Sequence, residues 1–387
     1  MKSFKEVGFT DEQIISRNFQ FSDFYSTTLI KLIMILNLTF NLVLMLLVYI
    51  HIFLTLLLIG VMLIIIYLLI RRLKYPEIPG FWGEYFGVTL NATNVYVKIP
   101  AKNLPQNEAG NIVITAHLDS KSQNYTTFQR VLLYRLWVYS GMVFGAFYIF
   151  YFITLVGHLP IPINIPLYGA WISSILISLS NIFLLFLNTG NESPGALDNA
   201  SGMAIVFELS KYFLSNPLNN FNIWCCQFSA EELGTMGSRI FVNDHAHEFV
   251  RGRVFQINFD MVSCICHKLN FIQYFKSYGI IFRKVIAPLL SKYIKKAATE
   301  ENLNVQGFHL IVGAHTDTVP FHLKKFDAVD ISTKVAALYT HSINDTPDKV
   351  DAEVLLDTCK LVRRAILILD KDYEILCKNN LLRCEVD

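Results

Sequence analysis

Two histidines and five acidic residues stand in this chain beside the ends of predicted strands, and together they have the composition of a metal-binding active site. They are His117, Asp119, Asp198, Glu231, Glu232, Asp260 and His341. Taken singly, each has an ordinary structural explanation, because a lone aspartate after a strand is usually a cap or loop residue. Seven such residues at the strand ends of one sheet favour a shared site.

These residue types match the needs of two zinc ions. Zinc binds histidine nitrogen and carboxylate oxygen at about 2.0–2.2 Å and leaves a position open for water in catalytic sites. One bridging carboxylate can hold two ions roughly 3.5–4 Å apart. Each ion then needs one histidine and one further carboxylate, which the chain supplies. The sequence therefore predicts two Zn²⁺ as cofactors.

Two of the spacings assign separate roles. His117 and Asp119 are two residues apart on an extended segment, so both point to one face, and we expect Asp119 to accept the second ring N–H of His117. Glu231 and Glu232 are adjacent and point in different directions. One of them can bind metal while the other serves as general base towards the attacking water.

Five segments carry these residues, and in order they resemble the motifs of co-catalytic di-zinc exopeptidases. The segments are ITAHLDS, SPGALDNASG, SAEELGTMGS, NFD and THSINDTPDKVD. The family is the aminopeptidase Y/S-type family of metallopeptidase clan MH, which also contains glutamate carboxypeptidases, and the resemblance covers about 95–128 and 190–360. It implies that His117 and Asp260 hold one zinc, that Glu232 and His341 hold the other, and that Asp198 bridges both. It further implies Glu231 as the base and Asp119 as the support of His117.

Two further segments have weaker signals. The segment TDTVPF (316–321) resembles the part of the family near the substrate pocket. His315 lies in GAHTDTVP, which looks like the metal motif of related deacylases, but here it follows the bridging aspartate and the glutamate pair instead of preceding them. We therefore interpret His315 as structural or pocket-lining. The cluster of Cys264, Cys266 and His267 lacks further ligands and is interpreted as incidental.

The polar part of the chain, 75–130 and 189–387, alternates strand and helix patterns. Short apolar runs predict strands at 112–116, 221–228, 254–259 and 308–312, and helical spacing predicts helices at 202–214 and 352–369. This alternation predicts an α/β domain with a largely parallel sheet, in which ligands bind beyond the carboxyl ends of the strands. The family resemblance implies the three-layer α/β/α zinc exopeptidase fold with a mixed central sheet.

The remaining chain is strongly apolar and predicts four transmembrane helices in two hairpins. Hydrophobic residues make up 53% of the chain and charged residues 17%, and the apolar residues are concentrated locally. The block 29–70 is about twice as long as a helix that crosses the roughly 30 Å hydrocarbon core, with a turn near Tyr49 and His51. Two further spans, about 136–157 and 167–188, form a hairpin inserted at 131–188, and 1–28 is a polar N-terminal segment.

Charge and cysteine patterns predict the surroundings. Lys and Arg flank the membrane side shared by both termini and are missing from the hairpin tips near 49–52 and 158–166, which places the catalytic domain in the cytoplasm. Seven cysteines without regular spacing favour a reducing compartment. The NxS/T sequons at Asn91, Asn124, Asn191 and Asn199 then have no role. A net charge of +2 is too small to indicate a nucleic-acid partner.

The sequence thus predicts a multi-pass membrane metallopeptidase, most simply an aminopeptidase. Because the inserted hairpin separates the HxD motif from the bridging aspartate, we expect a site near the bilayer and short, apolar peptide substrates. A carboxypeptidase or amidohydrolase on the same metals is the alternative, with Arg239, Arg251 and Arg253 available for a substrate carboxylate. A membrane scaffold with a peptidase-like domain that only binds is the alternative outside enzymes.

Overall fold

The computed structural model of the protein describes residues 1–73, 75–78, 80–265, 271–279, 282–310 and 315–378. The chain forms two compact units. Unit 1 comprises Met1–Phe21, Leu90–Thr127 and Thr189–Asp387, and unit 2 comprises Ser22–Thr89 and Phe128–Asn188. All seven candidate site residues fall in unit 1.

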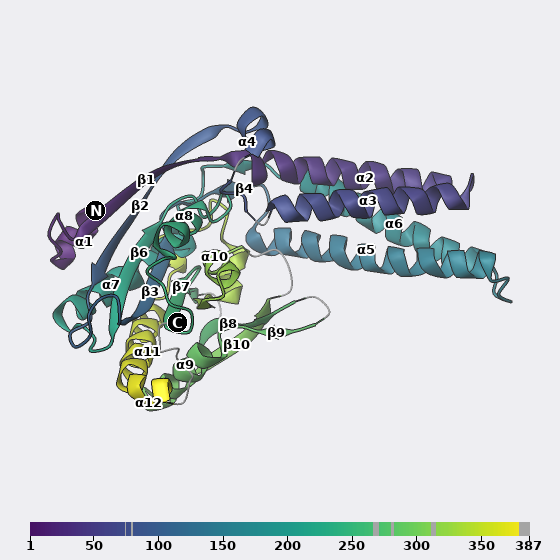
Figure 1. Ribbon diagram of the computed structural model, residues 1–387. Coiled ribbons are helices and arrows are strands. Elements are labelled where there is room, and N and C mark those ends of the chain that lie inside the picture. Colours follow the sequence, from purple (N-terminus) through teal and green to yellow (C-terminus); the bar gives the residue numbers. More distant parts are fainter. Residues whose placement is uncertain (74, 79, 266–270, 280–281, 311–314, 379–387) are drawn as a thin grey trace. The chain divides into compact units, whose positions relative to one another are not determined.

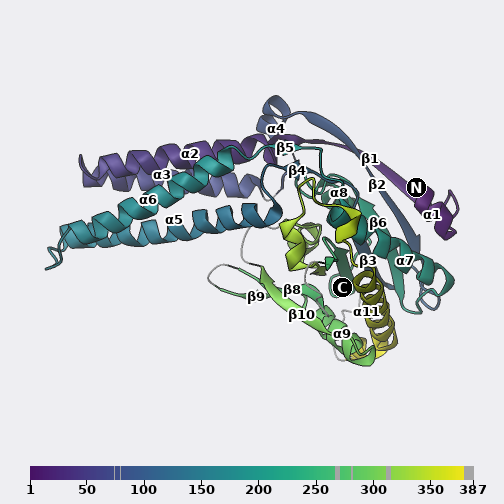
Figure 2. The ribbon, with the colours of Figure 1, turned by 180° about the vertical axis from the view of Figure 1, so that it is seen from behind.

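Unit 1 is built on a mixed β-sheet (Figures 1 and 2). Along the sheet the strands are β1 (Ile14–Ser22), β2 (Thr89–Ile99), β6 (Phe221–Phe228), β3 (Gly110–His117), β7 (Val254–Phe259), β11 (Asp327–Ile331), β8 (Ile272–Tyr278) and β10 (Val305–Leu310), and β9 (Lys284–Val285) pairs with β8. The central pairs β6–β3, β3–β7 and β7–β11 are parallel, as is β8–β10. The pairs β2–β6, β8–β11 and β8–β9 are antiparallel.

Helices cover both faces of this sheet because its central strands are apolar on both sides. In β3, Ile112 and Ile114 belong to one buried core and Val113 belongs to another. The first core contains side chains of α7 (Ser201–Ser215), α9 (Pro288–Glu300) and α11 (Ala352–Lys371). The second contains side chains of α8 (Met236–His245) and α10 (Thr318–Leu323). Fully buried strands of this kind are typical of parallel sheets with helices on both faces.

Most of the elements predicted from the apolar pattern are present. The strands predicted at 221–228 and 254–259 coincide with β6 and β7, and the one at 112–116 lies inside β3. The helices predicted at 202–214 and 352–369 lie within α7 and α11. The strand predicted at 308–312 overlaps β10, and its last two residues lie outside the described residues. The shorter elements are α12 (Tyr373–Lys378), η4 (Lys334–Leu338), η5 (Pro347–Lys349), β4 (Ser122–Gln123) and β5 (Thr189–Gly190).

Residues 1–21 of the polar N-terminal segment predicted over 1–28 belong to unit 1. Helix α1 (Lys2–Val7) buries Phe4 completely, and β1 joins the edge of the sheet. The Phe4 ring lies edge-on to Phe9 and Phe207, with ring centroids 5.8 and 4.9 Å apart. A few isolated aromatic residues anchor this segment, and they produce no periodic signal in the sequence.

Unit 2 consists mainly of long apolar helices that lie side by side in both views (Figures 1 and 2). They are α2 (Thr28–Leu47), α3 (Ile52–Leu73), α5 (Thr127–Val156) and α6 (Asn164–Leu185), together with the short η1 (Asp23–Tyr25) and α4 (Gly80–Phe86). Among the described residues, Asp23–Leu47, Thr127–Val156 and Asn164–Leu185 are long and apolar enough to cross a membrane, while the apolar run Phe53–Leu69 is shorter. The turn between α2 and α3 falls at 48–51, as predicted.

Polar contacts join the helices of unit 2. Asn41 donates from Nδ2 to the Ser174 carbonyl at 3.0 Å and to Ser178 Oγ at 2.9 Å. Asn37 Oδ1 accepts from Trp137 Nε1 at 3.1 Å. Hydrogen bonds of this kind stabilise helix association where no water is available.

The cysteines differ in state. Cys377 is disulfide-bonded. Cys225, Cys226 and Cys264 are buried and free, and Cys359 is half-buried and free. Cys266 and His267 lie outside the described residues.

Replacing Phe4 by alanine should destabilise unit 1 by about 3–5 kcal/mol, because the ring is fully buried and its loss leaves a cavity. Denaturant unfolding of the full chain in detergent, followed by the fluorescence of its four tryptophans, measures the effect. Lys2→Ala on the exposed side of the same helix is the control and should change the free energy of unfolding by less than about 0.5 kcal/mol. Equal effects of both variants would show that α1 is not packed on the core.

Candidate metal centre

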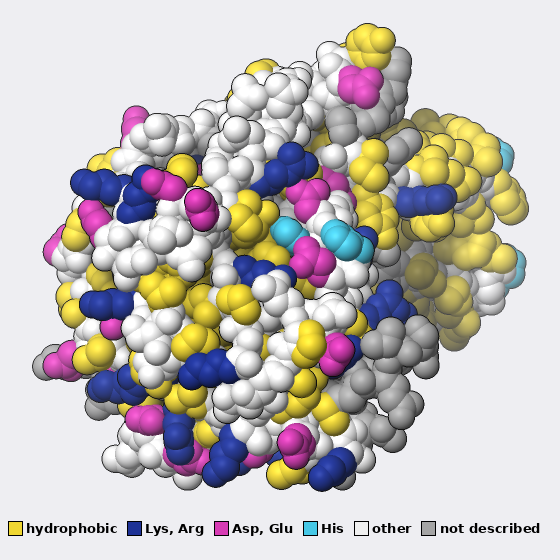
Figure 3. All heavy atoms as spheres, turned by 60° about the vertical axis from the view of Figure 1, so that its left-hand side comes forward, with side chains coloured by type: hydrophobic (Ala, Val, Ile, Leu, Met, Phe, Trp, Pro, Cys, Tyr) yellow, Lys and Arg dark blue, Asp and Glu magenta, His cyan; other side chains and the backbone are white. Residues whose placement is uncertain are grey.

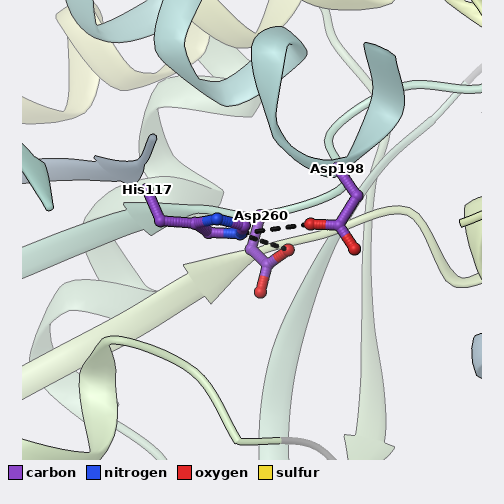
Figure 4. Close-up of side chains that lie close together, drawn as sticks. All are labelled: His117, Asp198 and Asp260. Carbon is purple, nitrogen blue, oxygen red and sulfur yellow. Dashed lines mark ion pairs between the residues drawn. The ribbon is translucent and has the colours of Figure 1, made fainter. Parts of the chain in front are cut away.

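The first group of potential metal ligands is His117, Asp198 and Asp260 (Figure 4). His117 is the last residue of β3 and Asp260 directly follows β7, and because these neighbouring strands are parallel, both residues lie at the same edge of the sheet. Asp198 comes from η2 (Ala196–Ala200), the turn that leads into α7. His117 Nε2 lies 3.1 Å from Asp198 Oδ1 and 3.7 Å from Asp260 Oδ1.

The second group is Asp198, Glu232 and His341. Glu232 follows β6, the neighbour of β3, and His341 lies in the loop after η4. His341 Nε2 is 3.1 Å from Asp198 Oδ2 and 3.0 Å from Glu232 Oε1. Asp198 is therefore common to both groups, and each of its two oxygens faces a different histidine.

The donor atoms of the two groups fit a pair of metal ions. Both histidines and Asp198 are buried, with at most 4% of each exposed. Within the described part of the chain, His117 Nε2 and Glu232 Oε1 are buried and make no hydrogen bond, and each faces a charged partner of its own group. Burying a polar atom without a hydrogen-bond partner or a metal ion costs free energy. Nitrogen and oxygen donors that converge on one shared carboxylate are suited to binding divalent cations. In the space-filling view, histidine side chains lie among acidic ones on one face (Figure 3).

Asp119 is close to His117, but its carboxylate does not hold the histidine as predicted. The ring Nδ1 of His117 pairs with the main-chain carbonyl of Asp119 at 2.8 Å, while the carboxylate Oδ1 is 3.9 Å away. The carboxylate instead accepts the backbone N–H groups of Glu231 and Glu232 at 3.1 and 3.0 Å. Because these two donors turn the side chain towards the loop after β6, Asp119 fixes the segment that carries both glutamates.

The two adjacent glutamates lie in opposite electrostatic environments. Burial raises the pKa of Glu231 well above its usual range, and the nearby carboxylates of Glu232 and Asp260 raise it further. Burial opposes ionisation of Glu232 as well, but His341 and Lys121 outweigh it and lower its pKa well below the usual range. Neighbouring carboxyl groups whose pKa values are driven apart are suited to different tasks.

Asp345 is a supporting residue that the sequence reasoning missed. Its carboxylate accepts the backbone N–H of Leu197 at 2.6 Å and that of Asp198 at 3.2 Å. It therefore fixes the turn that presents the shared Asp198 carboxylate. Its position four residues after His341, in the segment THSINDTPD, was the available signal, but an aspartate in a polar loop has no distinctive pattern.

The segment 316–321 forms part of a buried polar network around Asp330 of β11. Thr316 and Thr318 donate to Asp330 Oδ2 at 3.1 and 2.8 Å, and Asn258 donates to Asp330 Oδ1 at 2.9 Å. Burial raises the pKa of Asp330 to about 7 and that of Asp317 to about 7. His315 is exposed and belongs to neither ligand group.

Of the three arginines considered for a substrate carboxylate, two lie at the far end of β7 and the third contacts the loop after the glutamate pair. Arg253 immediately precedes β7, whereas Asp260 follows it, so the two residues are separated by the strand, about 20 Å at 3.3 Å per residue. Arg253 is buried and donates to the Glu108 carbonyl at 2.7 Å. Arg251 lies at the same end and is exposed, and Arg239 is buried with its Nε donating to the Gly234 carbonyl at 3.0 Å.

Comparisons with known proteins point to one family. Residues 181–366 match the family model described as Peptidase family M28. Aminopeptidase YwaD from Bacillus subtilis (strain 168) is 26% identical over 181 residues, which are 45% of this chain and 37% of YwaD. The solved structure of BSAP, a zinc aminopeptidase from Bacillus subtilis, is similar over 72% of this chain and 52% of its own, with 18% identity and a TM-score of 0.45. The solved structure of LapB from Legionella pneumophila is similar over 72% of this chain and 56% of its own, with 19% identity and a TM-score of 0.46.

This chain therefore spans 37% of the curated relative it matches and about half of each of these two solved structures.

The two glutamates can be separated by matched substitutions. Glu231→Gln should lower the rate of peptide hydrolysis on the order of 10²-fold or more with metal content unchanged, because the amide keeps the size of the side chain but accepts no proton. Glu232→Gln should instead lose metal from one of the two positions, since its Oε1 faces His341 and Asp198. Zinc content and turnover are measured on the same preparations. The opposite pattern, or near-normal turnover in both, would contradict the assignment.

Proposed function

Because the chain carries a Peptidase family M28 domain, we propose that it is a membrane-anchored di-zinc metallopeptidase of the aminopeptidase type, which removes residues from the N-termini of peptides. The observation that carries the proposal is the shared Asp198 carboxylate, with one histidine and one further carboxylate on each side. His117 and Asp260 would hold one zinc ion, and Glu232 and His341 the other. When bound, the two ions supply the positive charge that polarises the scissile carbonyl group and lowers the pKa of the attacking water.

The side chains around the metals would perform the proton transfers. Glu231 accepts the proton from the attacking water and returns it to the departing amine, so one carboxyl group acts first as base and then as acid. Its buried position, with 6% of the residue exposed, keeps bulk water away from that proton. Asp119 holds the loop of Glu231 by two hydrogen bonds to its backbone, and Asp345 holds the turn of Asp198.

The carboxypeptidase or amidohydrolase alternative receives less support from the geometry. A substrate carboxylate would need a free cation beside the metals. Arg251 and Arg253 lie at the opposite end of β7, and Lys121 is paired with the ligand Glu232. Arg239 is 2% exposed and its Nε is directed to the loop at Gly234 and Thr235. We therefore propose aminopeptidase activity, and the substrate panel described below also tests the alternative. The complete set of ligands speaks against a scaffold that only binds.

The membrane helices support a multi-pass protein whose site lies close to the bilayer. Helix α5 begins about ten residues after His117, and α6 ends about thirteen residues before Asp198. An extended chain covers at most about 3.3–3.6 Å per residue, so the metals would lie within about 35–45 Å of the ends of these helices. We propose four spans and, as substrates, short apolar peptides that are delivered along the membrane surface.

Metal removal combined with a substrate panel tests the proposed activity. The full chain in detergent should contain about two zinc ions, lose peptide hydrolysis in chelator and regain it on zinc addition. It should cleave amino-acyl substrates in preference to carboxy-terminal and acyl-amide substrates, and apolar dipeptides faster than polar ones of the same length. Hydrolysis that persists in metal-free protein would refute the mechanism, and preference for carboxy-terminal substrates would establish the alternative.

We propose that unit 1 faces the cytoplasm, because Lys and Arg flank the ends of the apolar helices nearest to it in sequence and are missing from the hairpin tips. The disulfide bond of Cys377 favours the non-cytoplasmic side, because disulfide bonds persist in oxidising compartments. Single reporter cysteines decide between them. A membrane-impermeant maleimide should label Pro162→Cys in intact cells and Lys211→Cys only after permeabilisation. The reverse labelling would place unit 1 outside the cytoplasm.

A further inference from the structure

The segment 121–127 joins the metal-binding end of β3 to the inserted helix α5, and it contacts one half of the metal centre. Lys121 Nζ lies 2.7 Å from Glu232 Oε2 and also donates to the Glu232 carbonyl at 3.0 Å. The Lys121 side chain is 13% exposed and that of Glu232 is 6% exposed, so the ion pair is largely shielded from water. Lys121 occupies one carboxylate oxygen of Glu232, and the other, Oε1, faces His341.

Two residues further along, Gln123 holds the histidine of the same half. The Gln123 N–H donates to the His341 carbonyl at 2.8 Å, and Gln123 Oε1 lies 3.0 Å from His341 Nδ1. An amide oxygen only accepts, so this contact places the ring proton on Nδ1. The lone pair is then on Nε2, which faces Asp198 and Glu232. Hydrogen bonds of this kind orient metal-binding histidines and raise their basicity.

The same segment is fixed at its far end, where α5 begins. Thr127 donates its N–H to the Thr340 carbonyl at 3.3 Å, and Thr340 Oγ1 donates to Thr127 Oγ1 at 2.8 Å. Both threonines are buried, and Thr340 directly precedes His341. The segment is also paired in a two-stranded sheet, because β4 is antiparallel to β5, just after the inserted hairpin.

The other half of the metal centre has no such contact with the segment among the described residues. His117 is held at Nδ1 by the Asp119 carbonyl, and Asp260 follows a central strand of the sheet. These two ligands depend on β3 and β7, which are paired with each other. The segment 121–127 therefore contacts the Glu232–His341 half of the metal centre and not the His117–Asp260 half, within the described residues.

We propose that Lys121 and Gln123 are positioning residues for the Glu232–His341 half of the metal centre, and that the segment 121–127 couples this half to the base of the inserted helical hairpin. The inference rests on the proposed di-zinc function. Lys121 leaves Glu232 one oxygen for metal binding. Gln123 fixes the ring of His341, the other ligand of the same metal position. A lysine ammonium also repels a nearby metal ion. The proposal therefore requires that the gain in metal affinity from orienting Glu232 exceeds the loss from this repulsion.

Zinc titration of the metal-free full chain in detergent, against a competing chelator, tests the proposal. The wild type should bind two Zn²⁺. Lys121→Met and Gln123→Met should each weaken one position by about 10–100-fold and leave the other unchanged, as expected for residues that orient ligands. Lys121→Arg should restore most of the affinity. Thr127→Val should weaken the same position by a smaller factor. In the Co²⁺-substituted protein, both methionine variants should lose the absorption of one ion.

Lys102→Met and Gln106→Met, at exposed positions of unit 1, are the matched controls and should bind both ions as the wild type does. Thermal unfolding of the metal-free variants should match that of the controls, which separates positioning from loss of structure. A wild type that binds fewer than two ions refutes the proposed function itself. If the wild type binds two, unchanged or tighter binding in Lys121→Met and Gln123→Met refutes the positioning role. Unchanged binding in Thr127→Val refutes the coupling to α5.

Discussion

The concentration of carboxylates in a buried space is the constraint on which the rest of unit 1 depends. Asp198 lies close to Asp260 and His117 on one side and to Glu232 and His341 on the other. Asp198 and Asp260 are buried, and the Glu232 side chain is 6% exposed. Burial and mutual repulsion both disfavour charged carboxylates, so such a cluster is stable only with positive charge or hydrogen-bond donors around it. Lys121 provides one fixed positive charge, and two bound dications would provide the remainder.

The fold supplies this cluster through the ends of parallel strands. Strands β6, β3 and β7 are adjacent and point the same way, so the residues that follow them meet at one edge. The loops are then held by backbone hydrogen bonds to further carboxylates, Asp119 for the glutamate pair and Asp345 for the turn of Asp198. These supports use the same residue type as the ligands, which shows that the direction of a carboxylate, and not its presence, defines its role.

The inserted hairpin interrupts the chain between two of the ligand-bearing segments, and residues of both segments still belong to one ligand group. Because it contains two helices, the chain can return to the side from which it left, and β4 and β5 pair where it leaves and returns. The residues at this junction, Lys121 and Gln123, contact one ligand pair only. The first helix of the insertion therefore begins at the end of the segment that contacts Glu232 and His341.

The sequence by itself determined the apolar strands and helices, the apolar hairpins and the residue types of the candidate ligands, because periodicity and residue chemistry are local properties. It did not determine the packing of α1, since a few isolated aromatics produce no period. Only the tertiary structure decided which group accepts the His117 proton, where the arginines lie relative to the metals, and that Asp345, Lys121 and Gln123 support the site. Those contacts join segments up to about two hundred residues apart in the sequence. Which residues meet depends on the register of neighbouring strands and on the path of the loops, and no single stretch of sequence encodes either of these.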